Sequence, residues 1–206
     1  MFTGLVQTIG TIREIRPVPT GARLVVDPGD WTHRPSPGDS IAVSGCCLTL
    51  APDDAAGDGL PFDVVPQTLR LTTLGRRRPG DRVNLEHAAT PTTLLGGHLV
   101  QGHVEGLGEV VAVRTDGGEH RLRIRIPETL RPYLVAQGSI TLDGVSLTVA
   151  TVHDDGFDVA LVPTTVRATT LGAASVGTVL NVETDCIMRM VARMVERTRP
   201  DDPVTP

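Results

Sequence analysis

The sequence predicts an all-β protein that consists of two copies of one domain. Residues 40–50 return as residues 139–149, and residues 66–75 return as residues 163–172, in the same order. Single residues also repeat at matching places: Gly4, Val6 and Gly10 with Gly102, Val104 and Gly108, and Asn84 and Glu86 with Asn181 and Glu183. Because a spacing of roughly 98 residues is too long for a solenoid repeat, each copy is expected to be a whole folded unit.

Each copy reads as short strands separated by turn residues, which is typical of a β-barrel or a β-sandwich. Arginine alternates with leucine and isoleucine in residues 121–126, which predicts a half-buried strand with a charged outer face. Gly45 and Gly144 are expected at positive φ in sharp turns. Pro66 and Pro163 are expected to begin short helices that Gly75 and Gly172 cap. The expected strands are residues 5–12, 22–26, 40–43 and 83–86, and then 104–113, 120–126, 139–142 and 180–183.

The chain therefore divides into an N-terminal domain with a linker (residues 1–97), a C-terminal domain (98–185) and a final segment (186–206). Residues 88–97 are rich in Thr, Pro and Gly, as expected of the linker. In residues 186–199 apolar side chains recur at helical spacing, at Ile187, Met190, Val191, Met194 and Val195. Such a helix either packs on its own domain or associates with other copies of the chain. Residues 200–206 are expected to be disordered.

Composition excludes several classes of function. The net charge of −5 argues against a nucleic-acid surface, and all 19 basic residues are arginine, so no lysine can act as a base. One Trp, one Tyr and three Phe are too few for an aromatic stacking platform. Three cysteines without a CxxC pair predict no zinc or other metal site and a reduced, cytoplasmic protein. We find no signal peptide and no apolar run of the roughly 20 residues that a membrane helix needs.

Several motifs together closely resemble the riboflavin synthase α-chain family over residues 1–197. They are Met-Phe-Thr-Gly at residues 1–4, Gly-Cys-Cys-Leu-Thr at 45–49, Gly-Gly-His-Leu-Val-Gln-Gly-His-Val at 96–104, Asp-Gly-Val-Ser-Leu-Thr-Val at 143–149, and the paired Thr-Thr-Leu-Gly segments. The resemblance implies two six-stranded antiparallel Greek-key barrels and a C-terminal helix, assembled as a homotrimer. It also implies that the working site forms between the N-terminal barrel of one subunit and the C-terminal barrel of a neighbour.

The resemblance further implies a transferase that needs no cofactor. Two molecules of 6,7-dimethyl-8-ribityllumazine exchange a four-carbon unit and become riboflavin and 5-amino-6-ribitylaminouracil. The reaction requires a carbanion at the 7-methyl group of one ring system, which the electron-poor heterocycle itself stabilises. Holding the two reactants face to face can supply roughly 7–11 kcal/mol of the rate enhancement. Two stacked substrates provide each other with a flat surface, so few aromatic side chains are needed.

The resemblance places candidate site residues at matching positions of both copies. The N-terminal pocket is expected to contain Gly4, Leu5, Val6, Cys47, Leu48 and Thr49, with Asp63, Val64, Val65, Pro66, Gln67 and Thr68 along one wall. The C-terminal pocket is expected to contain Gly102, His103, Val104, Ser146, Leu147 and Thr148, with Leu161, Val162, Pro163, Thr164, Thr165 and Val166 opposite. Phe2 and Asp185 also match family positions tied to activity, and Gln137 is a further candidate for substrate binding.

The residue types suggest roles for the catalytic candidates. We expect His103 and Ser146 to move protons and polarise the reacting centre, and Cys47 to orient the other lumazine or add to its C7 atom. Thr49 and Thr148 are expected to form hydrogen bonds with heteroatoms of the lumazine ring. Asp185 would orient a partner or a proton relay, or simply cap the helix that follows it.

Alternatives remain for individual residues. Cys47 alone could be a small core residue. His98 and His103 could suggest a metal, but no third ligand has fitting spacing.

Some positions depart from the family pattern, namely Gln67 and Thr164 in place of glutamate, Ser44 in place of asparagine and Gln137 in place of lysine. Those departures leave room for a non-catalytic lumazine or flavin carrier of the same fold. A third possibility is a component that docks with a lumazine synthase shell.

Overall fold

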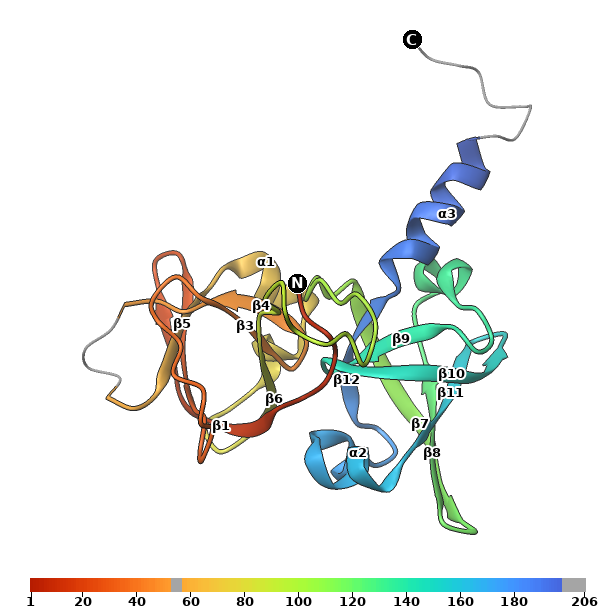
Figure 1. Cartoon of the computed structure of the whole chain (residues 1–206), viewed down its shortest axis with the longest axis horizontal. Helices are drawn as coiled ribbons and strands as arrows, with labels where there is room; N and C mark the ends of the chain where they lie inside the picture. Colours follow the sequence, from red (N-terminus) through yellow and green to blue (C-terminus); the bar gives the residue numbers. More distant parts are fainter. Residues whose placement is uncertain (53–56, 198–206) are drawn as a thin grey trace.

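The computed structural model describes residues 1–52 and 57–197, and it contains two six-stranded lobes and a projecting helix (Figure 1). The N-lobe comprises β1 (Thr8–Val18), β2 (Gly21–Asp27), β3 (Ser40–Val43), β4 (Cys46–Thr49), β5 (Leu60–Val64) and β6 (Arg82–His87). The C-lobe comprises β7 (Gly106–Asp116), β8 (Glu119–Arg125), β9 (Ser139–Leu142), β10 (Val145–His153), β11 (Gly156–Leu161) and β12 (Val179–Thr184). The helical elements are α1 (Pro66–Leu71), η2 (Thr73–Arg76), η3 (Glu128–Tyr133), α2 (Pro163–Ala168), η4 (Thr170–Ala173) and α3 (Cys186–Arg197).

The two lobes share one antiparallel Greek-key topology. In the C-lobe the strands close into a barrel in the order β10-β11-β8-β7-β12-β9, and the N-lobe has the equivalent order β4-β3-β6-β1-β2-β5. The end strands of the N-lobe meet only through an isolated bridge between Leu50 and Phe62. β4 has four residues where β10 has nine, and Pro61 in β5 has no backbone N–H to donate. The prediction of an all-β protein with two six-stranded lobes and a C-terminal helix is confirmed, and the C-lobe closes with a full ladder.

Each lobe has its own apolar core because side chains alternate between the two faces of its strands. Leu122 and Ile124 of β8 are fully buried, while the arginines that alternate with them point outward and pair with acidic residues of neighbouring strands, as the alternation predicted. Phe157 is fully buried in the C-lobe core, and Phe62 occupies the N-lobe core. The two lobes therefore have separate apolar cores.

The short helices α1 and α2 begin at proline as predicted, but they end earlier than expected. Thr72 and Thr169 are the C-terminal caps, and their hydroxyls accept hydrogen bonds from Leu74 N and Leu171 N in the 3-10 turns that follow. The prediction that Gly75 and Gly172 cap these helices is wrong. Both lie inside the 3-10 turns, where a Cβ would approach within 2.0 Å of a carbonyl oxygen of the preceding helix.

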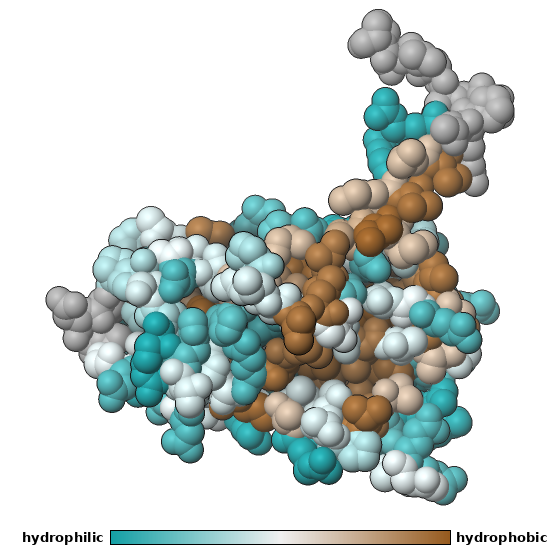
Figure 2. All heavy atoms as spheres, viewed as in Figure 1, coloured by the Kyte–Doolittle hydropathy of each residue, from teal (hydrophilic) through white to brown (hydrophobic). Residues whose placement is uncertain are grey.

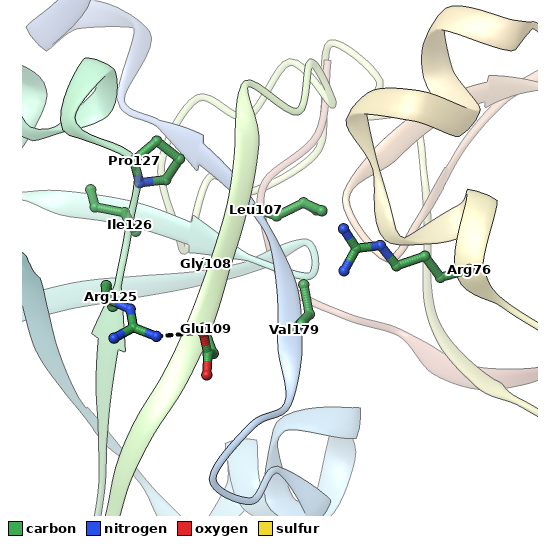
Figure 3. Close-up of a pocket in the computed structure, with 8 residues that line it drawn as sticks. All are labelled: Arg76, Leu107, Gly108, Glu109, Arg125, Ile126, Pro127 and Val179. Atoms are coloured by element: carbon green, nitrogen blue, oxygen red, sulfur yellow. Dashed lines mark hydrogen bonds and ion pairs between the residues drawn. The ribbon is translucent and has the colours of Figure 1, made fainter.

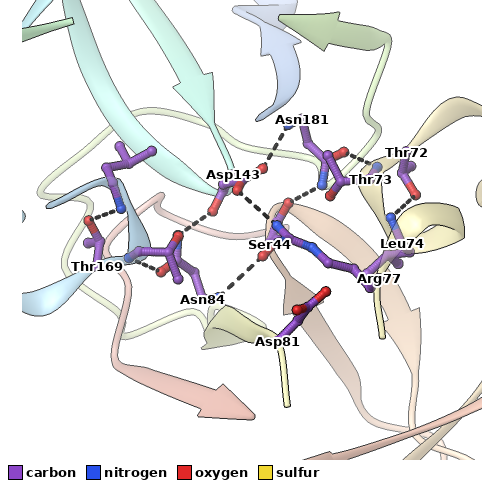
Figure 4. Close-up of polar contacts among 12 residues, drawn as sticks. Ser44, Thr72, Thr73, Leu74, Arg77, Asp81, Asn84, Asp143, Thr169 and Asn181 are labelled. Atoms are coloured by element: carbon purple, nitrogen blue, oxygen red, sulfur yellow. Dashed lines mark hydrogen bonds and ion pairs between the residues drawn. The ribbon is translucent and has the colours of Figure 1, made fainter. Parts of the chain in front are cut away.

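The lobes meet at the tips of two hairpins, β3–β4 and β9–β10 (Figure 4). Gly45 and Gly144 have φ values of 77° and 81°, as predicted for the turns, and Ser44 and Asp143 before them are also left-handed. A Cβ on Gly45 would lie 2.5 Å from Gly144 N, and one on Gly144 would lie 2.7 Å from Gly45 N. Only glycine lets the two backbones come this close.

Two asparagines fasten this contact reciprocally (Figure 4). Asn84 of the N-lobe donates to Asp143 O and accepts from Thr170 N, both at 2.8 Å. Asn181 of the C-lobe donates to Ser44 O at 2.8 Å and accepts from Thr73 N at 2.7 Å. Since both asparagines are buried, their amides satisfy backbone groups that would otherwise lose hydrogen bonds to water.

The segments that precede β1 and β7 cross to the opposite lobe. Gly4 O accepts from Ser146 N and Gly102 O accepts from Cys47 N, each at 2.8 Å. Val6 packs against the C-lobe core, and Val104 packs against the N-lobe core. The strands β1 and β7 consequently begin later than the sequence predicted, at Thr8 and Gly106.

A buried glutamate of each lobe holds each crossing segment. Glu86 accepts from Thr3 N and Thr3 Oγ1, both at 2.7 Å, and from Gly4 N at 3.0 Å. Glu183 accepts from the backbone N–H groups of residues 101 and 102 at 2.7 and 2.9 Å. Burial raises the pKa of both carboxyls, and these hydrogen bonds act in the opposite direction.

Helix α3 leaves the body of the molecule beyond β12 (Figure 1). It ends at Arg197 in the described residues, and the predicted disordered tail, residues 200–206, lies outside them. Its start is tied to the C-lobe by Arg189, which pairs with Glu105 and donates to Gln101 Oε1 at 2.7 Å. No helix among the described residues has the length and apolar composition to cross a membrane.

The buried Asp143 should make stability depend on pH. Burial raises the pKa of its carboxyl to about 6, although Asn181 N and Arg77 favour the charged form. Because the folded state holds the proton more tightly than the unfolded chain, whose carboxyl has a pKa of 3.8, this group makes the free energy of unfolding decline as pH rises from 3.8 to about 6. We expect Asp143→Asn to remove most of that decline in chemical denaturation series. The exposed Asp154→Asn is the control, and an unchanged pH dependence in Asp143→Asn would contradict the prediction.

The buried Glu86 should be needed to keep the first crossing segment in place. In Glu86→Gln the amide NH2 faces backbone donors instead of accepting from them, so we expect a loss of roughly 1–3 kcal/mol in the free energy of unfolding. Glu183→Gln should have a similar effect, whereas the exposed Glu14→Gln should have almost none. Equal denaturation midpoints for Glu86→Gln and wild type would show that the carboxylate does not hold the segment.

Candidate active site

The candidate catalytic side chains lie on the outer faces of two equivalent strands. Cys47 is half-buried and Thr49 exposed on β4, and Ser146 is half-buried and Thr148 exposed on β10. The leucines between them, Leu48 and Leu147, point into the cores. Any contact of Leu48 or Leu147 with a ligand would therefore involve the backbone.

Each outer face is completed by the crossing segment of the other lobe. Residues 4–6 lie beside Ser146, and residues 102–104 lie beside Cys47. The predicted grouping of Gly4, Leu5 and Val6 with Cys47, and of Gly102, His103 and Val104 with Ser146, is therefore wrong within one chain. The matched repeats could not reveal it, because both copies exchange their segments in the same way.

Glycine is required in both crossing segments. A Cβ on Gly4 would lie 2.5 Å from the Cβ of Ser146, and one on Gly102 would lie 2.6 Å from the Cβ of Cys47. We define the N-half-site as Cys47 and Thr49 with residues 102–104. The C-half-site is Ser146 and Thr148 with residues 4–6.

The structure separates the two residues that were expected to move protons together. His103 is exposed in the N-half-site, whereas Ser146 lies in the C-half-site. The histidine that contacts Ser146 is His98, whose Nδ1 lies 2.7 Å from Ser146 Oγ. The sequence offered a signal for His98: it follows two glycines in the linker and has no counterpart in the first copy.

His98 is held in a buried polar position. Its Nε2 lies 3.2 Å from Thr141 Oγ1, and the side chain of Thr141 is buried. Burial lowers the pKa of His98, and the negative charge of Asp185 opposes part of that effect. The imidazole is therefore neutral at neutral pH. Asp185 Oδ1 also accepts from Ile187 N at 2.9 Å at the start of α3, which is the capping role considered for it.

The predicted walls of both pockets are the segments that lead from β5 into α1 and from β11 into α2. Asp63 forms an ion pair with Arg23, with an Oδ1–Nε distance of 2.7 Å. Val64 and Leu161 belong to the cores. The exposed members are Val65, Pro66, Gln67, Val162, Pro163 and Thr164, and the half-buried members are Thr68, Thr165 and Val166.

Two other candidates, Phe2 and Gln137, and the neighbouring Cys46 lie outside the half-sites. Phe2 is buried with Ala42 and Val100, and its N–H donates to Val100 O at 2.7 Å. Gln137 is an exposed turn residue with a φ of 65°. Cys46 is buried, and burial raises the pKa of its thiol to about 12, so it remains a protonated core residue. Cys46 thus has a structural role.

A separate hollow of about 330 Å³ lies between the lobes, away from the half-sites (Figure 3). Arg76 reaches from the N-lobe toward Leu107 and Val179 of the C-lobe, and an ion pair between Arg125 and Glu109 lies on the other side. The hollow contains none of the predicted site residues. Over the described part of the chain, no three His, Cys, Asp or Glu side chains gather closely enough to hold a metal ion.

Comparison with known proteins places this architecture in a family. The family model of the lumazine binding domain matches twice, at residues 3–88 and 101–185. The chain is 44% identical to the riboflavin synthase of Mycobacterium bovis over 199 residues, which cover 95% of this chain and 98% of that protein. It is 37% identical to the riboflavin synthase of Schizosaccharomyces pombe, with 95% and 94% covered.

Solved structures agree with this result. The chain is similar to a crystal structure of LumP complexed with 6,7-dimethyl-8-(1'-D-ribityl) lumazine, with a TM-score of 0.79 and 29% identity over 89% of this chain and 99% of that chain. A crystal structure of LumP complexed with riboflavin gives a TM-score of 0.79 and 30% identity over the same shares. The duplicated six-stranded lobes, the double match to the lumazine binding domain and the near full-length identity together establish that this chain belongs to the riboflavin synthase family.

Proposed function

We propose that this chain is a riboflavin synthase, a transferase that moves a four-carbon unit between two molecules of 6,7-dimethyl-8-ribityllumazine. The products are riboflavin and 5-amino-6-ribitylaminouracil. The observation that carries the proposal is the paired arrangement of Cys47 and Thr49 on β4 and of Ser146 and Thr148 on β10. Two equivalent half-sites suit a reaction between two identical substrates.

In this proposal each half-site binds one lumazine. The exposed hydroxyls of Thr49 and Thr148 would form hydrogen bonds with heteroatoms of the lumazine rings. The half-buried Cys47 and Ser146 would face the reacting edge of each ring. His103 would act beside Cys47, since it belongs to the N-half-site. The electron-poor ring holds the negative charge of the carbanion, so the residues mainly orient the reactants and move protons. The proposal requires no cofactor or metal.

The half-sites of one chain are open, and we propose that assembly closes them. Thr49, Thr148 and His103 are exposed in the single chain. In a homotrimer, the N-half-site of one subunit would face the C-half-site of a neighbour, so that the two lumazines stack.

Helix α3 supports this assembly. It presents an exposed apolar face made of Ile187, Met190, Val191, Met194 and Val195, which are 46–68% exposed. Figure 2 shows hydrophobic residues along the helix and on the adjoining surface of the body. A self-association helix would bury this face at the trimer centre. The other face carries Arg193 and Glu196, which pair with each other.

A non-catalytic carrier of lumazine or flavin is the second candidate. The solved LumP complexes with a lumazine, with riboflavin and with flavin mononucleotide favour it, as do Gln67, Thr164 and Gln137 in place of charged residues. Identity to riboflavin synthases reaches 44%, against 28–30% for the LumP chains, which favours the enzyme.

We also propose a cytoplasmic location. Association with lumazine synthase stays a proposal, and residues 201–206, which could carry a docking segment, lie outside the described residues.

Turnover distinguishes the two candidates. Purified protein mixed with 6,7-dimethyl-8-ribityllumazine should produce riboflavin, measured by its absorbance. Ser146→Ala should lower kcat by roughly 100-fold or more, because it removes a proton-transferring hydroxyl, while the dissociation constant changes little. The exposed Ser175→Ala is the matched control. Tight binding without any product in the wild type would establish the carrier instead.

The apolar face of α3 should control both assembly and turnover. We expect Met190→Glu with Met194→Glu to convert the trimer to monomers in analytical ultracentrifugation, because a buried unpaired charge is costly. Riboflavin formation should fall at least 10-fold, since each working site needs two subunits. Arg193→Glu on the opposite face should leave both properties unchanged. A fully active monomeric double variant would refute the shared site.

A further inference from the structure

A buried hydrogen-bonded chain stands behind the C-half-site and has no place in the reaction described so far. It runs from Ser146 Oγ to His98 Nδ1 at 2.7 Å, and from His98 Nε2 to Thr141 Oγ1 at 3.2 Å. His98 is 9% exposed and Thr141 is 1% exposed, so only the Ser146 end reaches the surface where a ligand can bind. The half-buried Ser146 hydroxyl can pass a proton to His98, and Thr141 Oγ1 can accept a hydrogen bond from the imidazolium that results.

The backbone around His98 is built to hold this contact. His98 N donates to Thr3 O at 3.2 Å, in the crossing segment that Glu86 fixes. A Cβ on Gly97 would lie 2.1 Å from Thr3 O and 2.9 Å from the Cβ of Ser146. Glycine at this position therefore lets the linker approach β10 closely enough for the imidazole to reach Ser146.

The N-half-site has no such chain. Cys47, the counterpart of Ser146, packs against the apolar cluster of Phe2, Ala42 and Val100. Ala42 stands where the C-lobe has Thr141, so the hydroxyl that ends the chain is also missing. The duplicated lobes thus differ where a proton would be taken up.

We propose that His98 is a positioning residue that acts through Ser146 and serves as the proton acceptor of the C-half-site. The proposal rests on the riboflavin synthase function and deepens it, because it makes the C-half-site the place where a lumazine loses a 7-methyl proton. The N-half-site, with Cys47 on an apolar cluster, then holds the second lumazine as the electrophile.

The proton step balances within these groups. The C–H bond of the 7-methyl group breaks, and its electron pair stays in the conjugated ring. The proton goes to Ser146 Oγ while the Ser146 hydroxyl proton passes to His98 Nδ1. His98 becomes an imidazolium whose Nε2–H donates to Thr141 Oγ1. The proton returns along the same route when a later intermediate is protonated.

The surroundings of His98 keep it ready to accept. Burial lowers its pKa, and Asp185 is the charged group that raises it. The other groups that face it, Thr3, Thr141 and Ser146, are neutral. Neutral His98 is the active form, so turnover should fall as pH decreases through its pKa, which burial holds below the usual value for histidine.

His98→Asn is the sharpest test, because the amide oxygen can accept from Ser146 as Nδ1 does but cannot take a proton. We expect kcat to fall by roughly 100-fold, KM to stay within about threefold, and the acidic limb of the pH profile to disappear. His120→Gln, in the exposed β7–β8 hairpin, is the control. Thr141→Val removes only the last hydroxyl and should lower kcat by roughly 10-fold with native unfolding behaviour, so it also serves if His98→Asn does not fold.

Exchange of the 7-methyl protons in D2O, followed by NMR, separates this proposal from the proposed function. The wild type should accelerate exchange over the buffer rate, and His98→Asn, or Thr141→Val in its place, should abolish most of that acceleration. Accelerated exchange without riboflavin formation would defeat the synthase function but retain the relay. Absence of accelerated exchange in the wild type, or wild-type kcat in His98→Asn, would overturn the relay. A change in KM alone would also overturn it, because it would indicate a structural role.

Discussion

Close backbone contact between two glycine turns, one from each lobe, sets how the two lobes are placed relative to each other. Gly45 and Gly144 come so close that a single added Cβ on either would meet the backbone of the other. Asn84 and Asn181 fasten the contact by bonding backbone groups of the opposite lobe. Because β4 and β10 start at these turns, fixing the turns also fixes the strands that carry the candidate catalytic side chains.

The crossing segments make each half-site a product of both lobes. Glu86 and Glu183 hold the segments from their own lobe, while Gly4 and Gly102 pair with the strand of the other. A single isolated lobe would therefore lack one side of its half-site. Both half-sites therefore depend on the duplication of the domain and on the exchange of the crossing segments between the two lobes.

Inside this nearly symmetric frame, a few substitutions make the half-sites chemically different. Cys47 faces an apolar cluster, whereas Ser146 faces His98 and Thr141. Two identical substrates that must react in different roles need such a difference. His98, which directly follows the linker and lies outside the repeated pattern, supplies this difference.

Repeats and two-residue alternation are local properties, so the duplication, the strand-rich lobes and the positive-φ turns could be predicted from the sequence. It also carried the family resemblance that the comparisons confirm. The folded chain was needed to show which lobe each crossing segment completes and that His98, rather than His103, reaches Ser146. Those contacts join residues 48 or more positions apart, and a repeated pattern is equally compatible with exchanged and unexchanged segments.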